Sequence, residues 1–419
     1  MAQIHKRVSS EQTKNVLEKY HNKQLDKQAA MAQLGLNRSR FFDLLKLYRA
    51  DKDNFSITYE RKAHTKFTAE QEILIAEELK KEKELIDNRD MPITDFNYSA
   101  IRDILVEKHG LTVSLPTIIA RAKTMGCYKA RGLKATHTRE VLTNYAGELI
   151  QHDASIHQWS PYIQEKFVAI TSLDDYSRGL LFADLFKTEN TWNHIHAVKS
   201  VVLSYGCPKS YYVDQHSIFR YVKNRDEYRP HKNYTTFTDD VDPQWKQVLK
   251  DLNIETIYAL SPQAKGKIER PYRWLQDRTV RRCAKEGVIT FEGVRKIFLE
   301  EADRYNTRQV HSTTKEIPSF RLQAALRQGK TIFRKFELPK PYKSLSDIFC
   351  LREKRVVDGY GRISLNNLKF PVSGIAAGQA VDIRLAPISE SLLEVRLWNQ
   401  NKLIGRHEVK AQDMPQVRF

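Results

Sequence analysis

The period of the hydrophobic residues changes twice along this chain, and each change marks a different kind of fold. Up to about residue 128, apolar residues recur at helical spacing. From about Tyr145 they form short apolar or alternating runs typical of strands, and after about residue 345 short alternating segments are separated by Gly and Asn turns. Because 419 residues are too many for one ordinary core, we predict a multidomain chain with an all-α N-terminal part, a central α/β domain and a small C-terminal β-barrel.

Composition narrows the class of partner. The chain carries 69 Lys and Arg against 51 Asp and Glu, a formal net charge of +18 with a pI near 9.5, which favours a polyanion such as nucleic acid. An anionic membrane is the alternative, but no apolar run approaches the ~20 residues that span a bilayer, and the first residues lack the apolar region of a signal peptide. We therefore expect a cytoplasmic protein with no membrane partner. The four cysteines never form a C-x-x-C pair, so neither a disulfide framework nor a zinc ribbon is predicted.

Residues 1–55 have the pattern of a helix-turn-helix DNA-binding domain. Three helical stretches follow one another, with Ser9 or Ser10 as the N-cap of the first and Asn37 as the N-cap of the third. A short Gly-containing turn precedes the third helix, which would present Arg38, Ser39 and Arg40 to a DNA groove. From residue 1 to residue 50 there are ten Lys and Arg against four Asp and Glu, which supports this interpretation.

A second trihelical unit is predicted over residues 65–128. Its last helix has Ser114 as the cap and Pro116 in the first turn, with Arg121 and Lys123 on the expected DNA-reading helix. Residues 129–144 form a basic linker without a hydrophobic period, in which Lys129, Arg131 and Lys134 would lie along DNA phosphates. The alternative for both units is a plain helical bundle with solvated basic faces.

Residues 145–325 are predicted to form an α/β domain with a mixed central sheet, in the order strand, strand, strand, helix, strand, helix, strand and long helix. We expect Asp153 to end the first strand and Asp214 to end the fourth, with Glu269 one turn inside the long helix. Ligand chemistry in such sheets gathers near strand ends, and hard divalent cations prefer carboxylate oxygens. The three acids therefore predict a site for two Mg²⁺ ions, for which Mn²⁺ would substitute, able to cleave a phosphodiester. Taken singly, each acid is better explained as a turn, cap or ion-pair residue, and it is the combination of the three that favours a metal site.

Basic residues surround the third acid. Lys265, Glu269 and Arg273 are at helical spacing, so the two bases would flank the acid on one helix face. Lys267 and Arg270 belong to the same stretch, and further along it we expect four more bases to meet phosphate: Arg278, Arg281, Arg282 and Lys285.

Five blocks of this domain carry a family resemblance: GELIQHDAS, SLDDYSRG, YYVDQHSIF, SPQAKGKIER and RYNTRQVHSTTKEIP. They resemble the integrase core of DDE transposases and retroviral-type integrases, in particular bacterial insertion-sequence transposases of the ISNCY type. The resemblance covers about residues 145 to 320 and implies an RNase H-like fold and a metal-dependent phosphoryl transferase with Asp153, Asp214 and Glu269 as the catalytic, metal-binding triad. It also places Asn306 and His311 in the family's closing YN…H element, although both are equally explained as packing or capping residues.

Two departures from that family's pattern are expected to matter. The separation of Asp214 and Glu269 is longer than is usual, and we assign the excess to an insertion at about residues 220–243. The insertion contains Asp239, Asp240 and Asp242, which we expect to be poor ligands because they lie in a turn-rich loop. Gln215 and His216 follow the second Asp where Asn-Gly is common, and His216 would either contact the scissile phosphate or cap the following turn.

The C-terminal domain is predicted over residues 345–419. Its basic residues would contact DNA, and a structural or self-association role is equally compatible with the pattern. The candidate DNA contacts are Arg352, Lys354, Arg355 and Arg384.

Together these features predict a DNA transposase of the bacterial cytoplasm, associated with the nucleoid. It would bind the terminal inverted repeats of its mobile element as double-stranded DNA, cleave their 3′ ends and transfer them to target DNA, acting as a homodimer or higher homo-oligomer. The alternatives are a non-catalytic helix-turn-helix regulator with a degenerate core and an RNase H-type nuclease that cuts without joining.

Overall fold

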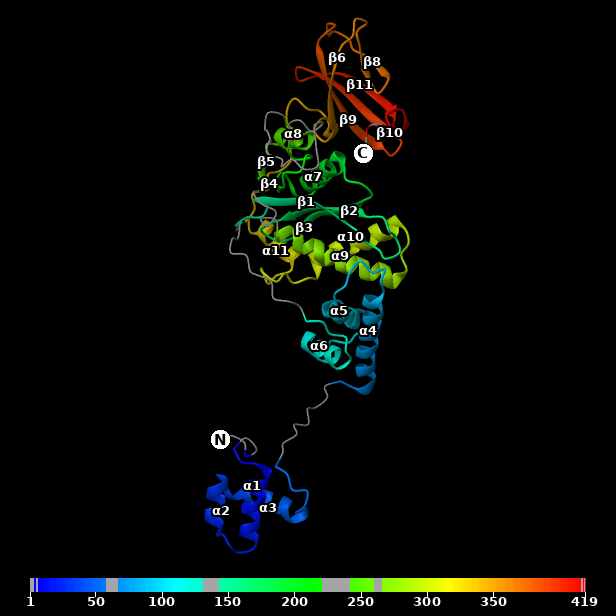
Figure 1. The fold of residues 1–419 in the computed structure, drawn as a ribbon. Coiled ribbons are helices and arrows are strands. Elements are labelled where there is room, and N and C mark those ends of the chain that lie inside the picture. Colours follow the sequence, from blue (N-terminus) through cyan, green and yellow to red (C-terminus); the bar gives the residue numbers. More distant parts are fainter. Residues whose placement is uncertain are drawn as a thin grey trace, which may run out of the picture. The chain divides into compact units, whose positions relative to one another are not determined.

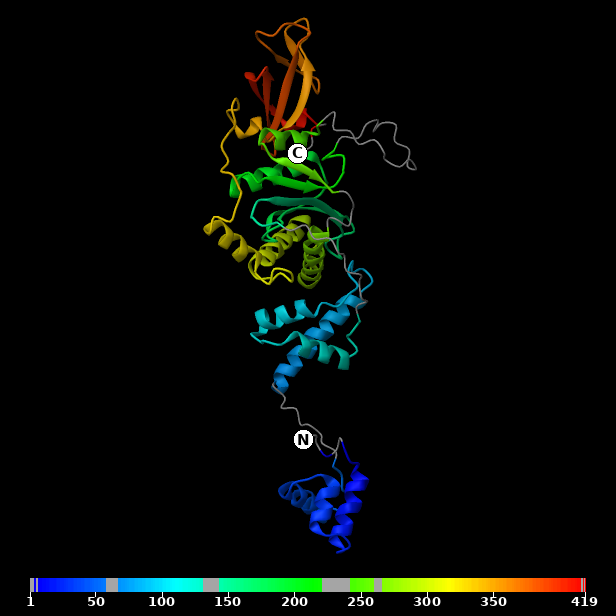
Figure 2. The ribbon, with the colours of Figure 1, turned by 90° about the vertical axis from the view of Figure 1, so that its left-hand side faces the viewer.

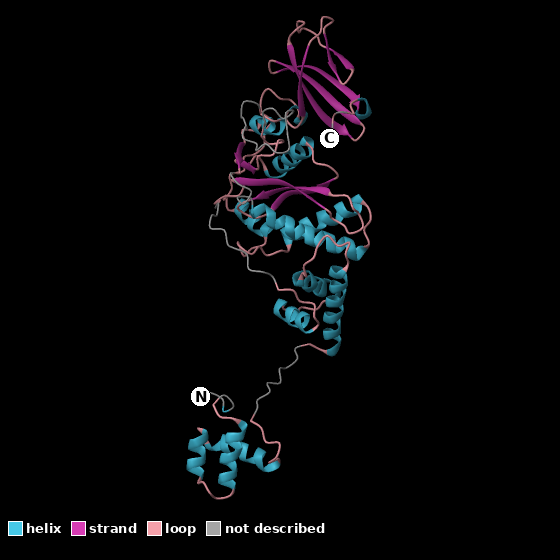
Figure 3. Ribbon diagram, viewed as in Figure 1, coloured by secondary structure: helices cyan, strands magenta, loops and turns pink. Residues whose placement is uncertain are grey.

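Figures 1, 2 and 3 show the fold of the chain in a computed structural model. It describes residues 4, 7–57, 67–130, 143–220, 242–259, 266–415, 417 and 419, with only the backbone of Gly266 and Lys267. The described residues fall into two compact units, Met1–Ile73 and Leu74–Phe419, and each is treated by itself. Arg131, Lys134, Lys265, Asp239 and Asp240, together with most of the predicted insertion, lie outside the described residues.

The first unit contains the three predicted helices: α1 (Ser10–His21), α2 (Lys27–Leu34) and α3 (Arg38–Ala50). Ser9 caps α1 in a capping box with Gln12, and the side chain of Asn37 accepts the backbone N–H of Arg40 to cap α3. Gly35 ends α2 in the left-handed conformation, with φ +60°. Leu17, Phe41 and Leu44 are buried between the helices, so the predicted helical fold is confirmed for this part of the chain.

The second unit begins within helix α4 (Ala69–Asp87), which is followed by α5 (Tyr98–His109) and α6 (Leu115–Thr124). Ser114 caps α6 and a proline occupies its first turn, as predicted. Ile75, Leu79, Ile101 and Ile118 are buried, so this trihelical region is also confirmed as helical.

A five-stranded mixed sheet forms the centre of the second unit. The strands are β1 (Leu149–His157), β2 (Phe167–Asp174), β3 (Leu180–Phe186), β4 (Ser210–Val213) and β5 (Glu255–Tyr258). Their order is β3-β2-β1-β4-β5, with β2 antiparallel to β1 and β3, and β4 parallel to both β1 and β5. The predicted mixed central sheet is therefore confirmed.

Helices cover both faces of this sheet (Figure 1). One face packs on α7 (Thr191–Tyr205) and α8 (Gln244–Asp251) through a core that includes Ile150, Val198 and Trp245. The other face packs on α9 (Gly266–Glu286) and α10 (Phe291–Thr307) through Ala169, Leu275 and Phe298. A further helix, α11 (Pro318–Arg327), contributes Leu322 and Ala325 to the first core.

The contact between the trihelical region and the sheet domain contains several desolvated ion pairs. Arg281 of α9, with 3% of its side chain exposed, pairs with the buried Glu82 of α4 and with Asp277. Arg278 of α9 and Arg304 of α10 both pair with Asp103 of α5, at 2.8 and 3.2 Å. Such pairs are poor evidence of net stability, but they hold two elements in a defined relation because a separated charge would stay buried.

The C-terminal region forms a β domain within the same unit. A four-stranded antiparallel sheet has the order β11-β10-β9-β6, and β7 and β8 form a separate two-stranded ribbon. The strands are β6 (Leu351–Val356), β7 (Arg362–Leu365), β8 (Leu368–Pro371), β9 (Ala380–Ser389), β10 (Leu392–Asn399) and β11 (Lys402–Lys410). Short 3₁₀ turns precede and follow them at η4 (Leu345–Asp347) and η5 (Ala411–Asp413). The predicted antiparallel β domain is confirmed, and its closure into a barrel stays a prediction.

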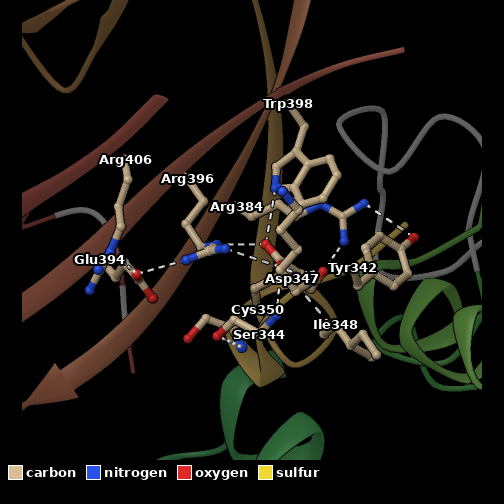
Figure 4. A network of polar contacts seen from close by, with 12 residues as sticks. Tyr342, Ser344, Asp347, Ile348, Cys350, Arg384, Glu394, Arg396, Trp398 and Arg406 are labelled. Atoms are coloured by element: carbon tan, nitrogen blue, oxygen red, sulfur yellow. Dashed lines mark hydrogen bonds and ion pairs between the residues drawn. The ribbon is translucent and has the colours of Figure 1, made fainter. Parts of the chain in front are cut away.

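A buried carboxylate joins this β domain to the segment that precedes it (Figure 4). Asp347 is fully buried and accepts hydrogen bonds from Arg396, from the indole of Trp398 at 3.0 Å, and from the backbone N–H groups of Lys343 and Ser344. The charge of Asp347 is therefore compensated by one guanidinium and three further donors.

Two of the predicted DNA contacts of this domain are wrong. Arg352 pairs with Asp251 of α8 at 2.5 Å, and Arg384 lies over the rings of Tyr342 and Trp398 and donates to the carbonyl of Asp347. Their side chains are only 14% and 12% exposed, since they hold the β domain against α8. Lys354 and Arg355 do lie at the surface, with side chains 79% and 41% exposed.

Two expectations from composition can also be compared with the fold. None of the described helices is long and apolar enough to cross a bilayer. All four cysteines are buried free thiols, as the absence of a C-x-x-C pair suggested.

We predict that Asp347→Ala destabilises the protein by about 3–5 kcal/mol, because it leaves the Arg396 guanidinium buried without its main partner. The measurement is urea unfolding followed by near-ultraviolet circular dichroism, which reports on Trp398. Asp413→Ala, at an exposed position of the same domain, is the matched control and should leave the midpoint unchanged. Equal effects of the two substitutions would contradict the role assigned to Asp347.

Candidate active site

Two of the predicted acids lie level with each other on neighbouring strands. β1 and β4 pair in parallel, with Ile150 opposite Tyr211 and Gln151 opposite Tyr212. Two residues further along each strand, the same register places Asp153 level with Asp214. Asp214 directly follows the last residue of β4. Neighbouring strands are about 4.8 Å apart, so the two aspartates occupy adjacent positions at this edge of the sheet.

The predicted strand end at Asp153 needs correction. β1 continues for four residues beyond Asp153 because residues 153–157 still pair with β2. What ends near Asp153 is the pairing with β4, whose last residue is Val213. One side of β1 is therefore free of a strand partner from about Asp153 onward.

A buried tyrosine of α9 contacts β1 at Asp153. The hydroxyl of Tyr272 donates a hydrogen bond to the backbone carbonyl of Asp153, and the carbonyl of Ala169 on β2 lies 3.4 Å from the same hydroxyl. Burial and the nearby carboxylate of Asp153 raise the pKa of Tyr272 well above its usual value, so the hydroxyl keeps its proton. Sequence reasoning missed Tyr272, although it lies three residues after Glu269 on the same helix.

Glu269 is exposed in the first turn of α9. Because residues three apart on a helix are neighbours, it lies next to Tyr272 on the part of α9 that meets β1. Within the residues that the structure describes, no group of three His, Cys, Asp or Glu side chains is placed to hold one metal ion. The structure thus brings Asp153 and Asp214 together, and the convergence of Glu269 with them stays a prediction.

The turn after β4 is closed by Asp214. Its Oδ1 accepts the backbone N–H of His216 at 2.9 Å, and the side chain of Gln215 donates to the carbonyl of Ala259 at 3.3 Å. His216 is exposed, with its ring 6.4 Å from that of Phe219, and its backbone carbonyl accepts the N–H groups of Phe219 and Arg220 in the following turn. Contact of His216 with a phosphate stays a prediction.

The basic residues of α9 divide into two groups. Arg270 and Arg273, near the start of the helix, are exposed, and Arg270 donates to the hydroxyl of Thr313 at 3.4 Å. The four bases further along pair with carboxylates instead: Arg278, Arg281, Arg282 and Lys285. The expectation that Arg278 and Arg281 meet phosphate is therefore wrong, because their side chains are only 7% and 3% exposed and pair with acids of α5 and α4. Contact of the partly exposed Arg282 and Lys285 with phosphate stays a prediction.

Most of the residues predicted to read DNA are exposed and lie in the first or last turn of their helix. Arg38, Ser39 and Arg40 are all exposed in the first turn of α3. On α6, Arg121 is partly buried, whereas Lys123 is exposed with its ammonium 4.8 Å from the ring centre of Tyr128. Lys129 is exposed and lies 3.6 Å from Asp95. Contact of these residues with DNA stays a prediction.

Asn306 of the YN…H element and two further acids, Asp174 and Asp242, have partners within the protein. Asn306 accepts the backbone N–H of Leu180 at 2.9 Å and donates to the carbonyl of the same residue at 2.8 Å, so it fastens α10 to β3. Asp174 accepts the N–H and hydroxyl of Ser177 and the N–H of Gly147, so its carboxylate shapes the turn into β3. Asp242 forms an ion pair with Lys246 at 3.1 Å and accepts a hydrogen bond from Lys250, so both lysines offset its charge.

His311 is surrounded by cations. The desolvation of its ring lowers the pKa of His311, and Arg178 from the β2–β3 turn, Arg270 from α9 and Arg321 from α11 lower it further, to about 4. Within the protein the imidazole is therefore neutral near neutral pH.

The comparisons with known proteins agree with the resemblance carried by the sequence. No protein-family model matches the chain. The chain is 28% identical over 264 residues to "Putative transposase y4bF" of Sinorhizobium fredii, a match that covers 63% of the chain and 52% of that protein. It is also 28% identical over 174 residues to the transposase for insertion sequence IS1202 of Streptococcus pneumoniae, covering 41% of the chain and 35% of that protein. The chain thus spans at most about half the length of these relatives, and its similarity to transposases is confirmed.

Among solved structures, the catalytic core domain of HTLV-2 integrase in complex with magnesium matches with 13% identity. The match covers 43% of this chain and 98% of that domain with a TM-score of 0.31, a value too low to support a structural conclusion.

We predict that His311 makes the folded protein less stable as the pH falls from 6.5 towards 4. The unfolded chain takes up a proton near the ordinary pKa of 6.5, whereas the folded protein does so only near 4, so protonation favours unfolding in this window. Urea unfolding above pH 6.5 and within the window should show that His311→Gln loses less stability than the wild type. His216→Gln, at an exposed position, is the control. If His311→Gln loses as much stability as the wild type, His311 does not titrate as described.

Proposed function

We propose that this chain, a relative of insertion-sequence transposases, is a metal-dependent DNA transposase that cleaves the 3′ ends of a mobile element and joins them to target DNA. Asp153, Asp214 and Glu269 are its catalytic acids. The observation that carries the proposal is the parallel register of β1 and β4, which brings two aspartates 61 residues apart in sequence to adjacent positions.

The donor set suits hard divalent cations. Asp153 and Asp214 offer carboxylate oxygens side by side, and Glu269 offers a third from the neighbouring helix, which is the chemistry that Mg²⁺ prefers and Mn²⁺ accepts. Two such ions, when bound, would activate a water or a 3′-hydroxyl and neutralise charge on the phosphodiester. The chain itself would hold the acids in place, and the exposed Arg270 and Arg273 would position the DNA backbone beside them.

DNA recognition is assigned to the two trihelical regions. The exposed first turn of α3 presents two guanidinium groups and a hydroxyl, which suit base edges and phosphates in a major groove. We assign residues 1–55 and 65–128 as DNA-binding domains, 145–325 as an RNase H-like catalytic core and 345–419 as a small β-barrel. The enzyme would work on double-stranded element ends and target DNA as a homodimer or larger assembly, in the bacterial cytoplasm at the nucleoid.

We predict that Asp153→Asn abolishes Mg²⁺-dependent nicking of element-end DNA while leaving the binding of that DNA nearly unchanged. The substitution removes a charged oxygen ligand and keeps the size of the side chain. Labelled DNA ends incubated with Mg²⁺ and resolved on a denaturing gel report nicked and joined products, and a mobility-shift assay reports binding.

Asp303→Asn, at an exposed position of α10, is the matched control and should cleave like the wild type. Equal loss of nicking and of binding in Asp153→Asn would show that Asp153 is structural. Full nicking by Asp153→Asn would show that the acid is not catalytic.

We also predict that replacing Arg38 and Arg40 together by Ala lowers affinity for element-end DNA by about 10-fold or more, since each specific base contact contributes about 1–3 kcal/mol. Affinity for scrambled DNA should fall much less. The control is the double substitution Lys46→Ala and Arg49→Ala further along the same helix. The assignment of α3 as the reading helix is wrong if both double variants lose end binding and scrambled binding to the same extent.

A further inference from the structure

A buried chain of hydrogen bonds runs beside Asp153. On β2, the hydroxyl of Ser172 lies 2.9 Å from Nδ1 of His152, whose Nε2 lies 2.8 Å from Nδ1 of His194 on α7. Nε2 of His194 lies 3.0 Å from a carboxylate oxygen of Glu189. Both imidazoles are fully buried, whereas 20% of the Glu189 side chain is exposed.

The carboxylate at one end sets the direction of the chain. An ionised Glu189 can only accept, so Nε2 of His194 donates to it, and with one proton on the ring Nδ1 of His194 is the acceptor. His152 then donates from Nε2 and accepts the Ser172 hydroxyl at Nδ1. One proton on each ring satisfies both imidazoles, and every donor points towards Glu189.

The ring of His152 is also held by aromatic contacts. It is stacked on Trp245 of α8, with ring centres 5.7 Å apart, and meets Tyr211 of β4 edge-on at 5.8 Å. Phe219, in the segment that follows Asp214, meets His152 at 5.7 Å and His194 at 5.0 Å. The histidine pair therefore contacts β1, β4 and the segment after β4 at the same time.

These are the segments that carry the two paired acids. His152 directly precedes Asp153 on β1, and because side chains alternate along a strand, it holds β1 from the face opposite Tyr272. Tyr211 lies three residues before Asp214, and Phe219 is tied to the Asp214 turn by its backbone hydrogen bond to the carbonyl of His216 at 2.9 Å.

We propose that the Ser172–His152–His194–Glu189 chain is a positioning network that holds Asp153 and Asp214 at the spacing needed to bind divalent metal ions. The inference rests on the proposed function. Side chains that bind hard cations need neighbouring groups that fix the orientation of those side chains. Mg²⁺ tolerates little departure from its preferred coordination geometry. The histidines act through the backbone of β1 and the packing of the Asp214 turn, without touching DNA or metal.

The test is a Mn²⁺ titration of the full chain without DNA, followed by electron paramagnetic resonance. His194→Phe keeps a ring of similar size and removes both hydrogen bonds, and we expect it to weaken Mn²⁺ binding by about 10-fold or more. Glu189→Gln keeps an acceptor for His194 and should bind Mn²⁺ like the wild type. His196→Phe, at an exposed position two residues along α7, is the matched control and should also bind normally.

The nicking reaction provides a second readout. Because misplaced ligands penalise the more demanding ion, His194→Phe should lose more Mg²⁺-dependent than Mn²⁺-dependent nicking, a ratio that a loss of folded protein would not change. Unaltered Mn²⁺ affinity in a folded His194→Phe protein overturns the inference. So does an equal loss in Glu189→Gln, because the charge of Glu189 and not the hydrogen-bonded chain would then be responsible.

Two further variants separate the possible failures. If His194→Phe does not fold, Ser172→Ala breaks the same chain at its other end, and an unchanged Mn²⁺ affinity in that variant also overturns the inference. Asp153→Asn in the same titration tests the proposed function. If Asp153→Asn retains Mn²⁺ binding, the assignment of the acids is wrong. If Asp153→Asn loses Mn²⁺ binding and His194→Phe keeps it, only the positioning network is rejected.

Discussion

The parallel pairing of β1 with β4 is the constraint on which the candidate site depends. Three paired positions, from Leu149 with Ser210 to Gln151 with Tyr212, set the register that brings Asp153 level with Asp214. A slip of one residue would turn one of the two aspartates to the other face of the sheet, because side chains alternate along a strand. The burial of Ile150 and Tyr211 in the core under α7 and α8 opposes such a slip. The packing of the core and the placement of the acids are therefore the same structural requirement.

The two faces of the sheet hold β1 at Asp153 by different means. On one face, α9 provides a single hydroxyl, that of Tyr272, which bonds the backbone carbonyl of Asp153. On the other face, His152 is enclosed by aromatic rings and hydrogen-bonded at both nitrogens. A backbone held from both sides loses little conformational freedom when a charged ligand binds next to it, which lowers the cost of ordering the site.

The sequence was most informative where local rules decide the structure. The N-caps Asn37 and Ser114 need only a side chain and the next turn of helix, and both were predicted. The partners of arginines were not predictable, since they depend on contacts distant in sequence: Arg281 meets Glu82, and Arg352 meets Asp251. The role of Tyr272 was missed because a tyrosine on an amphipathic helix has the same pattern whether its hydroxyl is buried or exposed. The position of Asp153 within β1 was missed because the strand outlasts its partner β4, and strand lengths follow from pairing.

The pairing of arginines within the protein also changes how the net charge of +18 should be understood. Arg278, Arg281, Arg352 and Arg396 pair with buried or partly buried acids, so their charge is compensated inside the protein. Fields from compensated pairs fall off quickly, whereas exposed cations without a close acid act over about a Debye length of 8–10 Å. The attraction for a polyanion therefore depends on where basic residues remain exposed, such as the first turn of α3 and the start of α9. A basic composition predicted the class of partner, but only the pairing of individual arginines shows which surfaces can meet it.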